Sequence, residues 1–79
     1  MAHIILDVDG TLISTESTEF KIIARPGLPS FLEYCFNNFE TVNIWTAAND
    51  YWFNKVYSEV IKPIISPHNW KFGFIFTSN

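Results

Sequence analysis

The sequence predicts an α/β fold built on a short parallel sheet. Apolar runs of strand length alternate with segments of helical periodicity, in the order strand, polar segment, helix, strand, helix, strand. Alternation of this kind favours parallel strands joined by crossovers. The first apolar run, residues 3–8, is nearly continuous, as strands buried on both faces are. Because 79 residues hold at most one small domain, we expect residues 1–79 to form a single truncated domain, an incomplete three-layer sandwich.

A polar segment follows the first strand. The strand ends at Asp9-Gly10-Thr11, where Gly10 permits a turn that a bulkier residue would resist. Residues 12–20 are mostly polar and are expected to form a loop or a small flap. Residues 21–24 are predicted to form a short strand, which Arg25-Pro26-Gly27 ends.

Two amphipathic segments predict the helices. Pro29 suits the first turn of the first helix. The apolar stripe of this helix consists of Phe31, Leu32, Cys35, Phe36 and Phe39. Asn49 or Asp50 can cap the second helix, and Pro63 is expected to end it.

The remaining strands complete a sheet of three. Residues 41–45 predict a core strand, residues 64–71 a loop, and residues 72–77 the last strand. Three strands leave two open edges and one under-covered face. We therefore expect a homo-oligomer, with strand exchange between two copies as one form of association.

The composition excludes several classes of protein. Five basic residues against eight acidic ones give a net charge of −3 without a basic run, so no nucleic-acid partner is expected. No stretch approaches the ~18 apolar residues of a membrane span, and the start lacks the charged region of a secretory signal. The single cysteine, Cys35, is expected to be a buried thiol. We expect a cytoplasmic or nuclear protein without a membrane partner.

Aromatic residues make up 18% of the chain. So many rings indicate either an aromatic core or rings that face a partner. We expect Trp45, Trp52 and Trp70 to lie in the core.

Two acidic residues end the first strand. Asp7 and Asp9 point to one face if the strand continues through them, and two such carboxylates repel by about 2–3 kcal/mol. The pair therefore favours a bound cation, and oxygen ligands favour Mg²⁺. One carboxylate can attack phosphorus while the other exchanges a proton with the leaving oxygen. A plain Asx turn has the same residues and stays open as the alternative.

Two further residues could contact an anion. Thr46 ends the second strand and is followed by the small residues Ala47 and Ala48. Ligands bind at the carboxyl ends of parallel strands, so its hydroxyl and nearby N–H groups are expected to hold a phosphoryl oxygen. A strand-ending threonine is also a common cap or turn residue. Arg25 could steer an anion or lie in solvent at its turn.

Taken together, these residues resemble the haloacid dehalogenase-like superfamily, whose first motif, D-x-D-x-T, is matched by Asp7, Asp9 and Thr11. A more specific branch is indicated by residues 25–32, 39–40, 44–48 and Tyr51. This branch is the phosphatases that act on the carboxy-terminal domain of RNA polymerase II, also called the NLI-interacting-factor-like family. The resemblance spans residues 3–77 and implies a Rossmann-like fold.

The resemblance implies a role for each matching residue. Asp7 would be the nucleophile that becomes an aspartyl phosphate, and Asp9 the general acid and base. Asp7 and, through its backbone carbonyl, Asp9 would hold Mg²⁺, while Thr46 and Ala47 would bind the phosphoryl group. The segment 12–24 would form a flap over the site. The substrate would be a protein phosphorylated on serine or threonine, or a small phosphate ester.

Two motifs of the family have no match here. The family has a lysine in its third motif and one or two aspartates in its fourth. No aspartate follows Asp50, and Lys55, Lys62 and Lys71 lie in other contexts. Three hypotheses follow: a Mg²⁺-dependent phosphatase of the aspartyl-phosphate type; a catalytically incomplete relative that binds or oligomerises, or a fragment of a longer phosphatase; and an acidic interaction domain whose paired aspartates are accidental.

Overall fold

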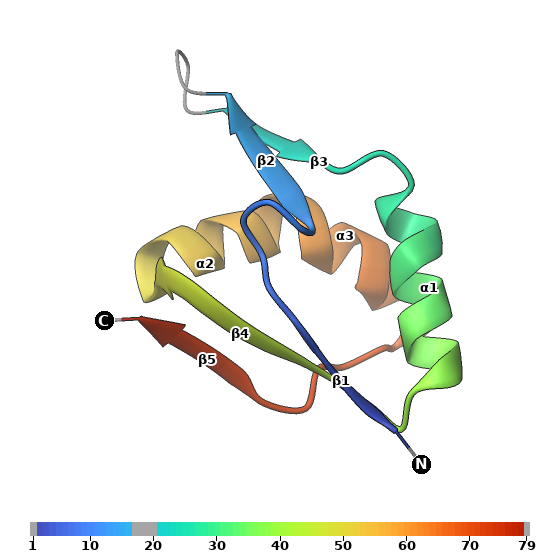
Figure 1. The fold of residues 1–79 in the computed structure, drawn as a ribbon. Coiled ribbons are helices and arrows are strands. Elements are labelled where there is room, and N and C mark those ends of the chain that lie inside the picture. Colours follow the sequence, from blue (N-terminus) through green and yellow to red (C-terminus); the bar gives the residue numbers. More distant parts are fainter. Residues whose placement is uncertain (1, 17–20, 79) are drawn as a thin grey trace.

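The main sheet has three parallel strands in the order β1-β4-β5 (Figure 1). The structure is a computed structural model that describes residues 2–16 and 21–78. The strands are β1 (His3–Leu6), β4 (Thr41–Asn49) and β5 (Ile75–Ser78). Leu6 pairs with Ile44, and Ile44 pairs with Ile75. The predicted α/β fold with a short parallel sheet is therefore confirmed.

A hairpin follows β1 and extends beyond its carboxyl end (Figure 1). It consists of β2 (Ile13–Glu16) and β3 (Lys21–Ala24), which run antiparallel. The strand predicted at 21–24 is confirmed; of the two forms expected for residues 12–20, a loop or a small flap, the hairpin corresponds to the flap, and β2 is a strand within it. The buried side chain of Ile13 anchors β2 in the core, and pairing with β3 supplies the hydrogen bonds that its polar sequence does not indicate. Residues 17–20 of the expected flap lie outside the described residues.

The first helix matches its prediction, and the second is longer than predicted. The helical segments are α1 (Leu28–Asn38), α2 (Asp50–Val56), the π-helical turn η1 (Tyr57–Ile61), α3 (Lys62–Ile65) and the 3₁₀ turn η2 (Ser66–His68). The helix does not end at Pro63, so part of the loop predicted at 64–71 is helical. Lys62 N–H donates to the Tyr57 carbonyl, five residues back. This wide turn places Pro63 at the start of α3, where its missing N–H is tolerated.

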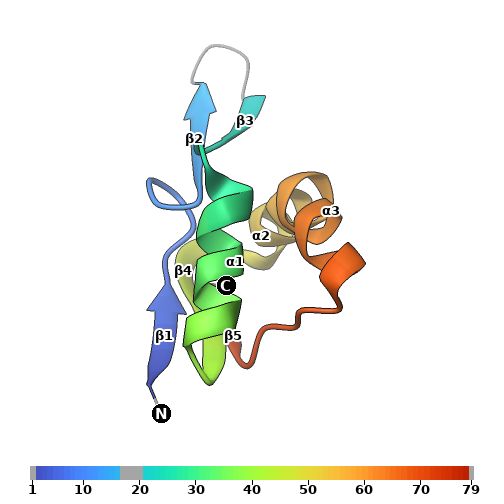
Figure 2. The same cartoon turned by 90° about the vertical axis from the view of Figure 1, so that its right-hand side faces the viewer.

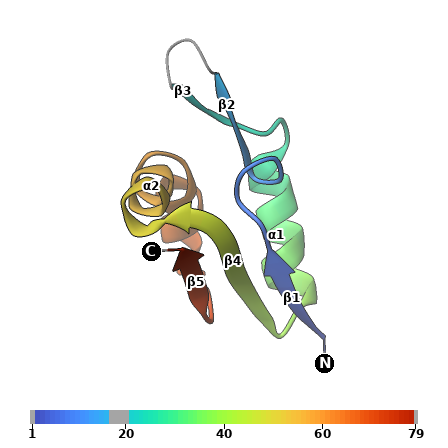
Figure 3. The same cartoon turned by 60° about the vertical axis from the view of Figure 1, so that its left-hand side comes forward.

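The helices lie on one side of the sheet (Figures 2 and 3). Between the helices and the strands is an apolar core of Leu6, Val8, Leu12, Ile13, Leu28, Leu32, Cys35, Val42, Ile44, Phe53, Val56, Ile61 and Ile65. The Cys35 thiol is buried as predicted, and burial raises its pKa. None of the helices in the described part of the chain is long and apolar enough to cross a membrane.

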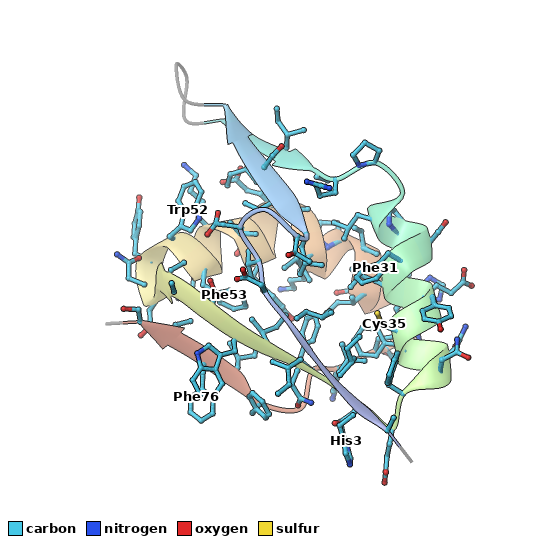
Figure 4. All side chains as sticks on the ribbon, in the orientation of Figure 1. His3, Phe31, Cys35, Trp52, Phe53 and Phe76 are labelled. Atoms are coloured by element: carbon cyan, nitrogen blue, oxygen red, sulfur yellow. The ribbon has the colours of Figure 1, made fainter. Side chains whose placement is uncertain are left out.

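In the described part of the chain, no helix covers the opposite face of the sheet, and several of its large apolar side chains are exposed. Ile5, Trp45 and Phe76 are 56%, 62% and 55% exposed, and the Trp45 and Phe76 rings lie 5.3 Å apart. Figure 4 shows Phe76 pointing away from the helices. Successive side chains of a strand alternate between faces, and helices cover only one face here. Two predictions were therefore wrong: β1 is not buried on both faces, and Trp45 does not lie in the core. Within residues 2–16 and 21–78, the expected three-layer sandwich has only one helical layer.

A buried asparagine joins β4 to the segment that leads into β5. The Asn43 amide nitrogen donates to the Ile4 carbonyl at 3.2 Å and to Thr41 Oγ1 at 2.9 Å. Its Oδ1 accepts the Phe74 N–H at 2.8 Å. The last strand, predicted at 72–77, is Ile75–Ser78. Just before it, the Phe74 N–H donates to the Asn43 side chain instead of to a backbone carbonyl of β4. Gly73 passes so close to Asn43 Oδ1 that a Cβ atom would overlap it.

Candidate active site

The turn after β1 carries the two predicted carboxylates. The Val8 side chain is fully buried, and the Val8 carbonyl accepts three N–H groups. These come from Thr11, Leu12 and Ile13 at 3.2, 2.9 and 3.1 Å. Gly10 has φ +82°, a conformation that glycine adopts without strain, and its N–H donates to the Ile13 carbonyl at 2.9 Å. The turn is thus anchored in the core through one residue between Asp7 and Asp9.

Both carboxylates are exposed on this turn. Asp7 Oδ1 accepts the Val8 N–H at 2.8 Å. Asp9 Oδ1 accepts the indole N–H of Trp52, on α2, at 3.3 Å. The side chain of Trp52 is half-buried, and Figure 4 shows it on the side of α2 that faces the turn. Each acid therefore has one carboxylate oxygen fixed by a hydrogen bond.

Thr46 lies at the same edge of the sheet. The β1–β4 pairing ends at Leu6 and Ile44, and Val8 and Thr46 each follow that pair by two residues. β4 continues to Asn49 instead of ending before Thr46, so the threonine is inside the strand and only 3% exposed. Its Oγ1 accepts the Ala48 N–H at 3.1 Å. That N–H is therefore engaged, which leaves the threonine hydroxyl proton and the exposed Ala47 as the groups for an anion.

Arg25 is exposed to solvent, as one of the two expectations had it, and it is also hydrogen-bonded to the turn. Its backbone N–H donates to the Leu12 carbonyl at 3.0 Å, and its Nη1 donates to the Gly10 carbonyl at 3.3 Å. The guanidinium also borders a cavity of about 420 Å³ whose lining is Gly10, Thr11, Arg25, Pro26, Leu28 and Phe31. The cavity therefore includes two residues of the turn, Gly10 and Thr11, together with a cationic and an aromatic side chain.

Sequence reasoning missed the contact between Trp52 and Asp9. Trp52 is one of the apolar residues of the second helix, and its position predicts only a core contact. A signal was available, because a partly buried indole N–H needs an acceptor and the first turn of a helix that follows β4 starts at the edge where Asp9 lies. The pairing of these two residues, 43 apart in sequence, depends on how α2 packs.

The donor set at the turn fits a hydrated divalent cation. The Asp7 carboxylate and the Asp9 backbone carbonyl supply only oxygen ligands, as Mg²⁺ prefers, and Mg²⁺ commonly binds one or two carboxylates together with waters and substrate phosphate. Across residues 2–16 and 21–78 there is no group of three or more histidine, cysteine or acidic residues that could hold a metal. Water or substrate oxygens would therefore complete the coordination of a cation held by Asp7 and Asp9.

Comparison with known proteins supports one family. The family model described as NLI interacting factor-like phosphatase matches residues 2–78, which is nearly the whole chain. No curated protein and no solved structure matches it significantly. The resemblance inferred from the motifs is thereby confirmed.

Proposed function

This protein belongs to the NLI interacting factor-like phosphatase family, and on that premise we propose that it hydrolyses phosphate monoesters at the turn after β1, with Mg²⁺ as cofactor. The observation that carries the proposal is the pair Asp7 and Asp9, both exposed on one turn that Val8 anchors in the core. On the neighbouring strand, Thr46 follows the last residue that pairs with β1 by two positions. This arrangement supplies a nucleophile, a proton donor and a hydroxyl for the phosphoryl group.

The proposed reaction has two steps. An Asp7 carboxylate oxygen bonds to phosphorus as the ester P–O bond breaks, and the Asp9 carboxyl gives its proton to the leaving oxygen, so that a neutral alcohol departs. The Asp9 carboxylate then takes a proton from water, whose oxygen attacks the aspartyl phosphate. The bond between phosphorus and Asp7 breaks, inorganic phosphate is released, and both side chains return to their starting states.

Two further groups would bind the transferring phosphoryl group. The Thr46 hydroxyl can donate its proton to a phosphoryl oxygen, because its Oγ1 uses only acceptor capacity toward Ala48. Ala47 is exposed beside it and would contribute its backbone N–H. Mg²⁺, held by Asp7 and Asp9, would supply positive charge against the phosphoryl oxygens.

The substrate class that we propose is a protein phosphorylated on serine or threonine, with a small phosphate ester as the simpler case. Asp7 and Asp9 are exposed, so a bulky phosphorylated chain can approach them. The cavity beside the turn presents the Arg25 guanidinium and the Phe31 ring, which suit the charged and apolar groups that flank a phosphorylated residue in a peptide.

Hydrolysis of p-nitrophenyl phosphate tests the proposal. We expect turnover that requires Mg²⁺ and is lost when the ion is chelated. Mg²⁺ should also raise the melting temperature, because a ligand that binds only the folded state stabilises it, and Asp7→Asn, which removes a charged ligand, should reduce that rise. Replacing Thr46 by valine, which keeps the shape and removes the hydroxyl, should weaken turnover and leave the Mg²⁺ effect on melting. A chain that shows neither turnover nor a Mg²⁺ effect would contradict the proposal.

A second candidate is a binding module that associates with itself. It is favoured by the absence of a third acidic ligand among residues 2–16 and 21–78 and by the exposed sheet face with Ile5, Trp45 and Phe76. A homo-oligomer, with or without exchange of strands, would cover this face. Light scattering should then show a mass above that of one chain, lowered by Phe76→Ser. A monomer at high concentration would exclude this candidate.

A further inference from the structure

We propose that Trp52 is a positioning residue of the site, whose indole N–H fixes Asp9 in the orientation from which it donates its proton. This role deepens the proposed function and rests on it, since it presumes that Asp9 is the general acid. The observation is the hydrogen bond of 3.3 Å from Trp52 Nε1 to Asp9 Oδ1, which joins α2 to the turn after β1.

Trp52 is itself held in place. Its backbone N–H donates to Asn49 Oδ1 at 2.8 Å, and this bond caps α2 at its start. The ring is half-buried and packs against the core. Because α2 begins directly after β4, its first turn stands at the carboxyl edge of the sheet. The indole nitrogen is therefore fixed by the helix cap and by the ring contacts.

Asp9 has few other constraints. Its side chain is exposed, and the Trp52 indole is the group that donates to it in the described part of the chain. An exposed carboxyl can rotate, and a misplacement of about 1 Å at a reacting group can cost on the order of 10²-fold in rate. One fixed oxygen removes much of that freedom.

The chemistry of the indole also decides which oxygen carries the proton. Indole Nε1–H is a donor and cannot accept, so Oδ1 of Asp9 must remain an acceptor. When Asp9 is protonated, its proton therefore resides on Oδ2, the oxygen that does not face Trp52. After the proton has passed to the leaving oxygen, the same hydrogen bond to Oδ1 persists, and the carboxylate is held for the second step. One contact thus serves both halves of the reaction.

Replacing Trp52 by phenylalanine separates the N–H from the packing of the ring. The decisive readout compares two esters with different leaving groups. Phosphoserine has an alcohol leaving group that needs a proton, whereas p-nitrophenolate leaves readily without one. We expect Trp52→Phe to lower kcat/KM, which reports the first bond-breaking step, about 10- to 100-fold for phosphoserine and less than about 3-fold for p-nitrophenyl phosphate.

Trp70→Phe is the matched control. Trp70 is also half-buried, but it stacks on Phe36 and His68, so this variant loses a comparable ring without touching Asp9. It should change kcat/KM for the two esters by the same small factor. Equal losses for both esters in Trp52→Phe would assign Trp52 a merely structural part and overturn the proposed role. A wild-type chain that hydrolyses neither ester would instead overturn the proposed function, and the role of Trp52 with it.

A second measurement tests the contact without turnover. In a two-dimensional nitrogen–proton NMR spectrum, the indole N–H resonance of Trp52 should move when Asp9 is replaced by alanine. The indole resonance of Trp70 should stay in place in the same variant. A Trp52 resonance that does not respond to Asp9→Ala would show that the hydrogen bond is not formed, and would overturn the proposed role even if the wild-type chain is an active phosphatase.

Discussion

The turn after β1 and the helix-covered face of the sheet meet at Val8, yet their side chains differ greatly in burial and therefore in how much they stabilise the fold. Asp7 and Asp9 are exposed, with one hydrogen bond each. On the covered face, Leu32 and Ile44 have no exposed surface. Val8 belongs to both regions, because its side chain lies in the core while its carbonyl organises the turn.

The difference teaches where activity and stability should separate. A buried aliphatic side chain contributes about 1.5–3 kcal/mol to folding, whereas an exposed carboxylate with one hydrogen bond contributes little. The two acids therefore contribute little to folding, and the buried Val8 between them keeps the turn in place. Substitutions of the two acids should lower turnover without lowering the free energy of unfolding, whereas substitutions in the core should lower the free energy of unfolding.

The largest expected effect is on turnover, in Asp7→Asn. The amide cannot attack phosphorus, so kcat/KM for p-nitrophenyl phosphate should fall by roughly 10³-fold or more. The amide oxygen can still accept the Val8 N–H, so the free energy of unfolding should stay within about 0.5 kcal/mol. Enzyme assays and urea denaturation of the same preparation measure both quantities.

Glu33→Gln is the control for this prediction, because Glu33 is an exposed acid on α1. It should alter neither quantity. A loss of turnover in Glu33→Gln equal to that in Asp7→Asn, or unfolding of the Asp7 variant, would contradict the proposal that activity and stability depend on different residues.

The converse effect is expected in Leu32→Ala, on the covered face. Removing this fully buried side chain leaves a cavity and should cost about 2–5 kcal/mol. The stability of a domain this small is on the order of 4–12 kcal/mol, so a large share of it would be lost. Urea denaturation measures the change, and Leu32→Met, which keeps the volume, should cost less than about 1.5 kcal/mol. Equal losses in the two variants would show that the cavity is not the cause.

A smaller loss of stability is expected at the other end of β4, in Gly73→Ala. The added Cβ would overlap Asn43 Oδ1, and displacement of that amide would break its bonds to Ile4, Thr41 and Phe74. We expect a cost of about 1–3 kcal/mol in the free energy of unfolding. In an Asn43→Ala background the overlap is gone, so Gly73→Ala should cost less there; additive losses in this double-mutant cycle would rule out the explanation.

The parts of the fold that follow from local patterns were predictable from the sequence. The alternation of strand and helix patterns indicated the parallel sheet, and Pro29 with its apolar stripe indicated α1. The positions of Asp7 and Thr46 at one edge of the sheet followed from the parallel order. Each of these inferences needs only neighbours in sequence and one general property of α/β sheets.

The parts that depend on packing were not predictable in this way. Which face of the sheet the helices cover decides that Ile44 is buried and Trp45 exposed, although both are apolar neighbours in β4. The helix continues past Pro63 because a π-helical turn precedes it. The bond from Trp52 to Asp9 requires that α2 and the turn lie side by side. These features arise from contacts between distant segments, which a local pattern does not specify.

The smallest expected effect concerns Cys35, on the covered face, and appears only at alkaline pH. Burial raises the pKa of the thiol above its ordinary value of 9.0, so the folded chain keeps a proton that the unfolded chain releases. The resulting stabilisation is fully present below about pH 9 and is lost as the pH rises through the folded-state pKa. The free energy of unfolding, measured by urea between pH 8 and 10.5, should therefore fall more steeply in the wild type than in Cys35→Ala. Equal slopes would show that the thiol ionises as readily in the folded chain as in the unfolded chain, and would contradict the effect of burial.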